Sequence, residues 1–238
     1  MRRSAMSGAA VIATTLAIVL SGCGSDTKTQ PSTSNSTSKT TSATTSAKAA
    51  PTKTKVAPRD EDAKGPNPTI ATYIEQNKIQ ETPIKMGTPG APTIDLPVPD
   101  GWRPAGSDTP DWAYGAIVFT GPEAAEYTPS IVALVSKLTG NVDQQKILDL
   151  APGELKNLPG WKAMNEGETS TLGQYPAYQL GGTWTSDGQT KIVAQKTVVI
   201  PGSDGLYVLQ LNADGLEDQA EIVGAATDVI DEQTKIMP

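Results

Sequence analysis

Two pairs of residues in this sequence have types and spacing that could support hydrolysis. The chain contains no His and one Cys, which excludes a Ser-His-Asp triad, a Cys-His pair and a His-ligated metal. A hydrolase would then need a Ser–Lys dyad, such as Ser136 with Lys137, or paired carboxylates, such as Glu166 with Glu168.

Strand geometry argues against both pairs. Adjacent strand residues point to opposite faces, so Ser136 and Lys137 would not meet, and Lys137 is interpreted as a charge at a sheet end. Glu166 and Glu168 would share a face, where like charges are more typical of a solvent-facing edge than of an acid–base pair. We therefore expect no catalytic residue and no enzymatic activity, with a lipid or glycan hydrolase as the less favoured alternative.

Candidate metal and cofactor sites are equally weak. Asp214, Glu217 and Asp218 cluster where a helix is expected to begin, and carboxylates there stabilise the helix dipole. Their spacing matches no EF-hand loop. Gly181-Gly182 lies within an expected strand and lacks the pattern of a phosphate loop, so it is interpreted as a bulge or a close packing point. We expect no metal and no cofactor.

Aromatic residues provide the candidate ligand site. Trp112 and Tyr114 are expected to share one strand face, and Tyr178 and Trp184 another. Such residues could line an apolar pocket, although packing in the core is the default interpretation.

The elements that must position these residues are mostly strands. Extended segments are predicted at 94–96, 112–120, 130–138, 161–170, 175–186, 189–200 and 206–213. Asp187-Gly188 is a strong hairpin signal between two of them. Short turns between consecutive strands favour an antiparallel meander, and strands apolar on both faces indicate cover on both sides.

Three helices are predicted around this sheet. One is capped by Asn67 with Pro68 at its first position and ends near residue 79. A second has a capping box from Asn141 to Gln144 and runs to residue 150. The fold class is thus mixed α/β (α+β), with the sheet packed between helices.

The last and clearest helix spans about residues 215–235 and is capped by Asp214 with Glu217. Its apolar face, formed by Val223, Ala226, Val229 and Ile230, should pack on the sheet. The opposite face is acidic and is a candidate surface for a protein partner: Glu217, Glu221, Asp228 and Glu232.

The first residues have the pattern of a lipoprotein signal. Arg2 and Arg3 precede an apolar run, residues 9–20, that is too short to span a bilayer of roughly 30 Å. Leu20-Ser21-Gly22-Cys23 follows and is similar to the bacterial lipobox, which implies cleavage between Gly22 and Cys23 and lipid attachment to the Cys23 sulfur. A plain secretory signal with a chance Cys is the alternative. Several acyl chains would hold the protein at the membrane.

Composition divides the chain into three parts. Residues 1–22 are the expected signal peptide, and residues 23–67, which are rich in Ser and Thr, are expected to form a disordered tether with a reach of about 35–40 Å. Residues 68–238 form the expected folded domain. Residues 70–238 carry ten Lys/Arg against 22 Asp/Glu, a net charge of −12, which disfavours nucleic acid and tight docking of this domain on an anionic bilayer.

Several stretches resemble the LpqN/LpqT family of mycobacterial lipoproteins. They are residues 89–97, 111–118, 195–201 and 209–218, and the resemblance extends over nearly all of residues 68–238. It implies a PsbP-like fold, a binding or assembly module rather than an enzyme, and an actinobacterial envelope. The family provides no catalytic residue, and Cys23 is the only functional residue that the resemblance assigns.

The expected function is that of a non-catalytic accessory module in envelope lipid export or wall assembly. The protein should be lipid-anchored on the extracytoplasmic side of the membrane, partly shed, and bound to envelope proteins such as lipid transporters or wall acyltransferases, or to a lipid. A surface-exposed factor that engages a host protein is the alternative.

The lipobox leads to a first test. Replacing Cys23 by Ser (Cys23→Ser) removes the thiol that accepts the diacylglyceryl group, so the protein should move from the detergent phase to the aqueous phase on detergent partitioning. Continued membrane association equal to that of the unmodified protein would contradict the lipobox interpretation.

Overall fold

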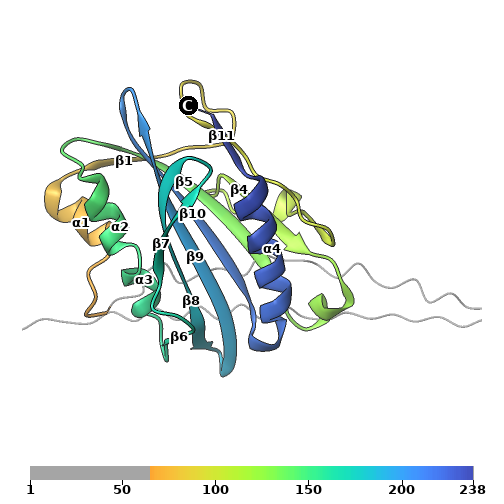
Figure 1. The fold of residues 1–238 in the computed structure, drawn as a ribbon. Coiled ribbons are helices and arrows are strands. Elements are labelled where there is room, and N and C mark those ends of the chain that lie inside the picture. Colours follow the sequence, from red (N-terminus) through yellow and green to blue (C-terminus); the bar gives the residue numbers. More distant parts are fainter. Residues whose placement is uncertain (1–64, 238) are drawn as a thin grey trace, which may run out of the picture. The chain divides into compact units, whose positions relative to one another are not determined.

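The computed structural model describes residues 65–237 of the 238-residue chain (Figure 1). The signal peptide, Cys23 and nearly all of the expected tether lie outside the described residues and stay predictions. Within residues 65–237, no helix combines the length and the apolar character needed to cross a bilayer. The helices are α1 (Ile70–Asn77), α2 (Gln144–Leu150), α3 (Gly153–Lys156) and α4 (Ala220–Gln233), with 3₁₀ turns η1 (Gly106–Asp108), η2 (Pro122–Ala125) and η3 (Glu217–Gln219).

An antiparallel sheet dominates this part of the chain, with strand order β3-β4-β5-β10-β9-β8-β6. In addition β1 pairs with β5 and β7 with β8, while β2 and β11 form a separate ribbon. The strands are β1 (Gln80–Pro83), β2 (Thr93–Asp95), β3 (Trp102–Pro104), β4 (Gly115–Phe119), β5 (Ser130–Thr139), β6 (Lys162–Ala163), β7 (Glu168–Leu172), β8 (Tyr175–Ser186), β9 (Gln189–Gly202), β10 (Gly205–Leu216) and β11 (Lys235–Met237).

The mixed α/β prediction with an antiparallel sheet is confirmed, but the sheet is not one uninterrupted meander. It consists of two meanders, β3–β4–β5 and β8–β9–β10, joined by the pairing of β5 with β10. That pairing aligns Leu209 with Val135, residues far apart in the sequence.

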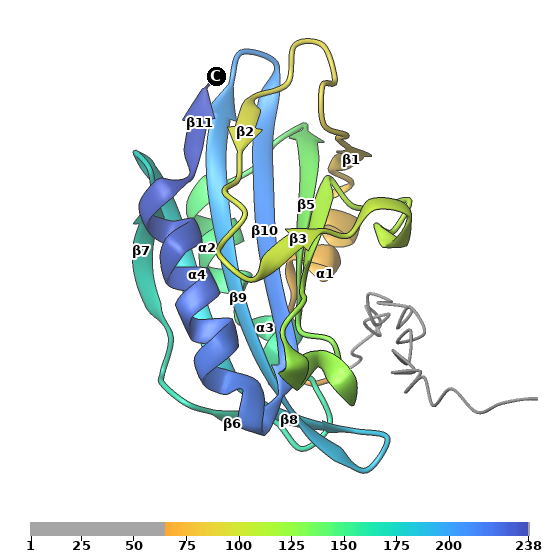
Figure 2. The same cartoon turned by 90° about the vertical axis from the view of Figure 1, so that its right-hand side faces the viewer.

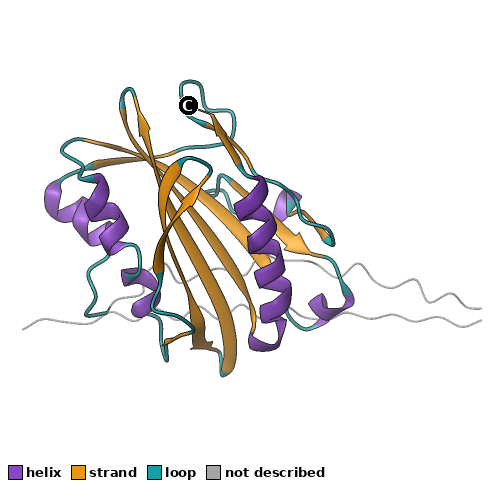
Figure 3. Cartoon of the chain, in the orientation of Figure 1, coloured by secondary structure: helices purple, strands orange, loops and turns teal. Residues whose placement is uncertain are grey.

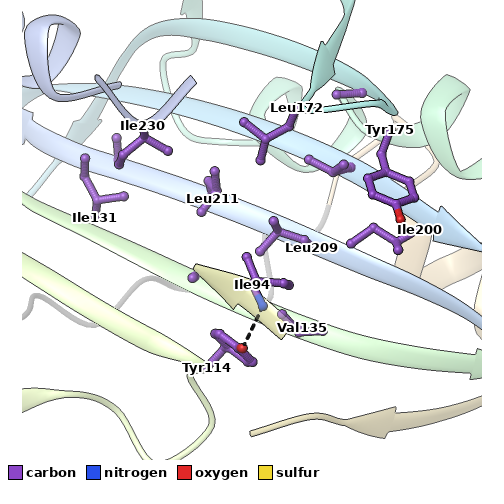
Figure 4. Packing of buried hydrophobic residues seen from close by; sticks show 14 of the residues in the cluster. Ile94, Tyr114, Ile131, Val135, Leu172, Tyr175, Ile200, Leu209, Leu211 and Ile230 are labelled. Carbon is purple, nitrogen blue, oxygen red and sulfur yellow. Dashed lines mark hydrogen bonds between the residues drawn. The ribbon is translucent and has the colours of Figure 1, made fainter. Parts of the chain in front are cut away.

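Helices cover both faces of the sheet, α4 on one side and α1, α2 and α3 on the other (Figure 3). In β9, Val198 and Ile200 belong to the cluster under α4, whereas Val199 between them packs with α1 and α2. Figure 4 shows the α4-side cluster, to which β10 contributes Leu209 and β9 contributes Ile200. Apolar residues on both faces of the strands therefore did indicate a doubly covered sheet.

The Asp187-Gly188 hairpin is confirmed. Both residues have positive φ, 51° and 76°, as a type I′ turn requires, and the flanking residues Ser186 and Gln189 are paired. Two predicted strands are shorter or divided: the segment predicted at 112–120 becomes strand only from Gly115, and the one predicted at 161–170 is split into β6 and β7 by a turn in which Gly167 has φ of 78°.

The caps predicted for the first two helices are wrong by two residues. Thr69 caps α1 in a capping box with Thr72, while Asn67 instead exchanges hydrogen bonds with Asn157 next to α3. Asp143, not Asn141, caps α2 by accepting from two backbone N–H groups of the first turn. In each case another residue with a suitable oxygen lies closer to the first helical turn.

The cap predicted for the last helix is also wrong. Strand β10 runs on to Leu216, so Asp214 is a strand residue, and its carboxylate accepts a hydrogen bond from the Tyr127 hydroxyl. The turn η3 follows, and the Gln219 side chain accepts from the Leu216 N–H at 2.8 Å. Continued pairing with β9 delays the helix by about one turn relative to the sequence prediction.

A small polar cluster connects the β9–β10 turn to the rest of the sheet. Lys137 on β5 forms an ion pair with Asp204, and the buried Tyr207 hydroxyl donates either to Asp204 or to the Gly90 carbonyl, each at 3.2 Å. Hydrogen bonding to Lys137 lowers the pKa of Asp204, while the same contact raises the pKa of Lys137. Burial raises the pKa of the Tyr207 hydroxyl.

These shifts predict a pH dependence of stability. Because the folded-state pKa of Asp204 lies below its unfolded value, its contribution is complete above the unfolded value, about 3.8, and is lost as the pH falls through the folded value. The Asp204→Asn variant should therefore be less stable than the unmodified protein at neutral pH, and the difference should vanish in acid.

Urea denaturation at several pH values measures this difference, which should be small because the ion pair is exposed. Asp111→Asn is the control, since Asp111 is exposed and forms no ion pair among the described residues. A difference that persists unchanged in strong acid would contradict the assignment.

Candidate functional site

An apolar cavity of about 330 Å³ lies between α4, the sheet and the segment that connects β2 to β4. Its size is at the lower end of the roughly 300–1,000 Å³ typical of small-molecule sites. No charged side chain lines it. The lining residues are Met86, Leu96, Pro97, Val98, Pro104, Gly106, Thr109, Tyr114, Gly115, Ala116, Ile117, Ile131, Ala133, Leu211 and Ile230.

Strand alternation builds the floor of the cavity. Ile131 and Ala133 on β5 and Leu211 on β10 point to the α4 side, where Ile230 of α4 meets them (Figure 4). Gly115 on β4 pairs with Ala133, so two of the smallest residues stand opposite each other at this place. Space is left because neither residue has a side chain long enough to reach α4.

A proline-rich segment closes one side. Leu96 and Val98 alternate with Pro97 and Pro99 after β2, and prolines restrict the backbone to extended conformations that cannot extend a central strand. The segment therefore runs past the sheet and places Leu96 against the cavity. Val98 and Met86, 46% and 67% exposed, lie at the rim, where the cavity reaches the surface.

Tyr114 is the aromatic residue that the structure places in this site. Its side chain is buried, and its hydroxyl accepts a hydrogen bond from the Ile94 N–H at 3.3 Å (Figure 4). This bond joins the β2–β11 ribbon to the wall of the cavity. Apart from the Tyr114 and Thr109 hydroxyls, the side chains that line the cavity are apolar.

A second cavity, of about 210 Å³, shares three residues with the first, namely Ile131, Leu211 and Ile230. Its other walls combine apolar residues, among them Leu180 and Ala194, with polar and charged side chains. Lys196 of β9 is buried and forms an ion pair with Asp231 of α4 at 2.6 Å, and Asn165, Gln179, Thr227 and Asp228 also line the space. The space under α4 therefore changes along the helix from an uncharged apolar lining to a mixed lining that includes an ion pair.

The structure separates the four aromatic residues proposed from the sequence. Trp112 is not in a strand but in the turn before β4, where it is 41% exposed, so its predicted common strand face with Tyr114 is wrong. The physical reason is the Asp111-Trp112 turn, which ends before the pairing of Gly115 with Ala133 begins.

Tyr178 and Trp184 lie on the opposite face of the sheet, in the cluster formed with α3. Trp184 is buried. Lys191 Nζ lies 5.6 Å from the centroid of the Trp184 ring and 4.7 Å from the centroid of the Tyr127 ring. Both aromatic residues are thus part of the packing on the α3 side, and neither reaches the cavity under α4.

The acidic residues Glu217, Glu221, Asp228 and Glu232 are all exposed. Glu217 belongs to η3, while the other three lie on one side of α4. Their role in binding a partner stays a prediction.

The residues considered for catalysis are not brought together. Glu166 lies in the turn before β7, so only Glu168 is a strand residue, and Glu168 accepts a hydrogen bond from Gln179 at 2.7 Å. The prediction that both share a strand face is wrong. Ser136 and Lys137 do lie on opposite faces of β5, and Lys137 is engaged with Asp204. Between residues 65 and 237, no three acidic, His or Cys side chains gather in a group that could hold a metal.

Sequence reasoning missed most of the cavity. Ile131 and Leu211 fall within predicted strands and Ile230 lies on the predicted apolar face of the last helix. Alternation and helical spacing predict which side such residues face, but not that space remains between them. The clearest available signal is the Leu96-Pro97-Val98-Pro99 run, in which apolar residues occur in a segment that cannot be a central strand.

Comparison with known proteins identifies the family. The sequence profile described as "Probable lipoprotein LpqN" matches residues 66–237. The chain belongs to this lipoprotein family. It is 54% identical over 178 residues to "Lipoprotein LpqN" of Mycobacterium tuberculosis (strain ATCC 25618 / H37Rv), covering 74% of this chain and 77% of that protein.

A solved structure of a relative agrees with this assignment. A crystal structure of LpqN "involved in cell envelope biogenesis" of Mycobacterium tuberculosis matches with a TM-score of 0.70 and 54% identity, over 73% of this chain and all of that one. The solution structure of cyanobacterial PsbP from Synechocystis sp. PCC 6803 is a distant likeness, with 10% identity and a TM-score of 0.39 over 66% of this chain and 92% of the other. The resemblance to the LpqN family is confirmed, and the chain is a lipoprotein of the cell envelope.

The Tyr114 contact provides a test of the cavity wall. Tyr114→Phe leaves the buried Ile94 N–H without its acceptor, which should destabilise the protein by about 1–3 kcal/mol. Hydrogen exchange should show faster exchange of the Ile94 amide.

Tyr175→Phe is the matched control, because Tyr175 is also buried and its hydroxyl has no partner in residues 65–237. Equal effects of the two substitutions on the Ile94 amide would show that the hydrogen bond is not the stabilising contact.

Proposed function

We propose that this protein is a non-catalytic binding module of the cell envelope that holds the acyl chain of a lipid during lipid export or wall assembly. The apolar cavity under α4 is the observation on which the proposal depends. Its lining carries no charge, and its rim is formed by the exposed side chains of Met86 and Val98. Such a surface stabilises an aliphatic chain by removing it from water, at about 0.8 kcal/mol per buried CH₂.

The neighbouring polar cavity supports an amphiphilic ligand rather than a plain hydrocarbon. The two spaces share Ile131, Leu211 and Ile230, and the second is bordered by the Lys196–Asp231 ion pair and by amide side chains. An acyl chain in the first space would leave its polar end near groups that donate and accept hydrogen bonds.

A binding role fits the groups present better than a catalytic one. Tyr114 is the one titratable residue in the lining of the apolar cavity, and its hydroxyl accepts from the Ile94 backbone. A hydrolase would need a nucleophile or a carboxylate within reach of the bound lipid. The proposed lipid anchor at Cys23 on the extracytoplasmic side of the membrane would keep this domain near both lipids and membrane proteins, which raises their effective concentration.

A side chain added at Gly115 tests the cavity directly. A Cβ at Gly115 would have Met86 Cε, at 3.8 Å, as its nearest neighbour beyond the adjoining residues, so a larger residue fits the backbone there and would extend into the apolar space. The full-length lipoprotein is purified from envelopes of a mycobacterial host and its bound lipid is measured by native mass spectrometry. The unmodified protein should carry an acylated lipid, and Gly115→Leu should lose most of it.

Gly224→Leu is the matched control, because Gly224 on α4 lines neither of the two cavities under α4 and a Cβ there has no neighbour within 4 Å. The control should retain the lipid. Equal lipid content in both variants, or no lipid on the unmodified protein, would contradict the proposed function.

A further inference from the structure

A third hollow lies beside α4, next to the edge strands β3 and β4, and shares only Val98 with the apolar cavity. It has a volume of about 530 Å³ and runs between α4 and the segment from Val98 to Trp102. Figure 2 shows this side, with the chain between β2 and β3 passing beside α4. We call this hollow the α4 groove.

The floor of the α4 groove is apolar. Trp102 and Phe119 lie with ring centroids 5.7 Å apart and their planes inclined by 60°, and both line the groove. Ile222 and Val229 of α4 face them. Val229 was expected from the sequence to be on the core face of the helix, but it is only half-buried, since it lies at the edge of the groove.

The charged residues of the groove are all acidic. Asp100 and Glu221 contribute exposed carboxylates to its walls, and no Lys or Arg lines it. Neither carboxylate forms an ion pair with any residue in the range 65–237. Helix α4 as a whole carries Glu221, Asp228, Asp231 and Glu232 and no basic residue, and the ion pair of Asp231 is with Lys196.

The apolar floor and the acidic walls together indicate which kind of ligand the α4 groove can bind. Aromatic and aliphatic walls favour an inserted apolar side chain, as at the central positions of protein interfaces. Two carboxylates without cationic partners repel phosphate and other anions and attract Lys or Arg. A fatty chain alone would leave these carboxylates without partners, and an anionic bilayer surface would be repelled by the same charges.

We propose that the α4 groove binds a basic, amphipathic segment of another envelope protein. An aliphatic or aromatic side chain of that segment enters between Trp102 and Val229, and flanking Lys or Arg side chains pair with Asp100 and Glu221. The remaining carboxylates of α4, on Asp228 and Glu232, extend the acidic surface along the helix. This inference rests on the proposed accessory role, since it assigns a surface for the partner that such a module requires.

A photo-crosslinking amino acid at Ala225 tests the groove in living cells, in the full-length, lipid-anchored protein. Ala225 is exposed and lines the groove. The same amino acid at the exposed Thr169 of β7 is the positional control. Mass spectrometry of the crosslinked peptides should identify, from position 225 only, a segment of an envelope protein in which Lys or Arg flank an apolar residue.

Charge reversal then shows whether the contact is the one proposed. Glu221→Lys should lower the yield of that crosslink about tenfold, because it places like charges together. Glu75→Lys on α1 makes the same change on the other face of the sheet and should leave the yield unaltered. Reversal of the partner's basic residue to Glu should restore the crosslink in the Glu221→Lys background.

Other outcomes overturn the inference. These are crosslinks from position 225 to lipid only, to another copy of this chain, to an acidic segment or to nothing, and a yield that does not respond to Glu221→Lys. Bound lipid, measured on the same variants, separates the two proposals. In the protein that carries the photo-crosslinking amino acid at position 225 and is otherwise unmodified, lipid without any crosslink to a basic segment rejects the groove, whereas the crosslink without bound lipid rejects the acyl cavity.

Discussion

The burial of β9 and β10 on both faces is the constraint on which the rest of this structure depends. Val198, Val199 and Ile200 are fully buried although they alternate between the two sides, and Leu209 on β10 is equally inaccessible. Strands of this kind cannot leave either face in water. Helix α4 must therefore cover one face and α1, α2 and α3 the other, and the long-range pairing of β5 with β10 completes the layer between them.

The cavity under α4 follows from the sizes of the residues in that layer. Where Leu209 and Ile200 face the helix side, the space is filled, whereas at Gly115 and Ala133 the strands provide no side chain long enough to fill it. The proline-rich segment after β2 covers the opening from the side without joining the sheet. An apolar interior with an access route thus arises from ordinary core packing in which small residues are concentrated at one place.

Charged residues lie on the exposed side of α4 and are absent from the lining of the apolar cavity. The apolar cavity under α4 is neutral, while the outer side of α4 carries acidic residues and no basic one. The two proposed binding functions therefore use different sides of one helix, because Ile230 lines the apolar cavity and Glu221 lines the α4 groove. A change on one side of the helix can be made without altering the other, which makes the two functions experimentally separable.

Much of this architecture was readable from local sequence. Apolar extended segments predicted β5, β8, β9 and β10, and apolar residues on both strand faces predicted the cover on both sides of the sheet. Asp187-Gly188 predicted its hairpin, because these signals depend on neighbouring residues alone. The family, too, was recognisable from short stretches such as residues 111–118. Helix caps were predicted less well, because several oxygen-bearing side chains near the start of each helix could act as the N-cap. Which of them does so depends on where the preceding strand or loop ends.

Tertiary structure alone decided which residues meet. The four aromatic side chains considered as pocket residues are divided among a surface turn, the α4 side and the α3 side. The face that a strand residue occupies depends on its register with distant strands. Whether packing leaves a void depends on the volumes of residues from β4, β5, β10 and α4 together. No local sequence pattern contains the combined volume of side chains from four separate elements. The sequence by itself therefore determined the elements and their apolar faces, and the assembled fold determined the cavity and the groove.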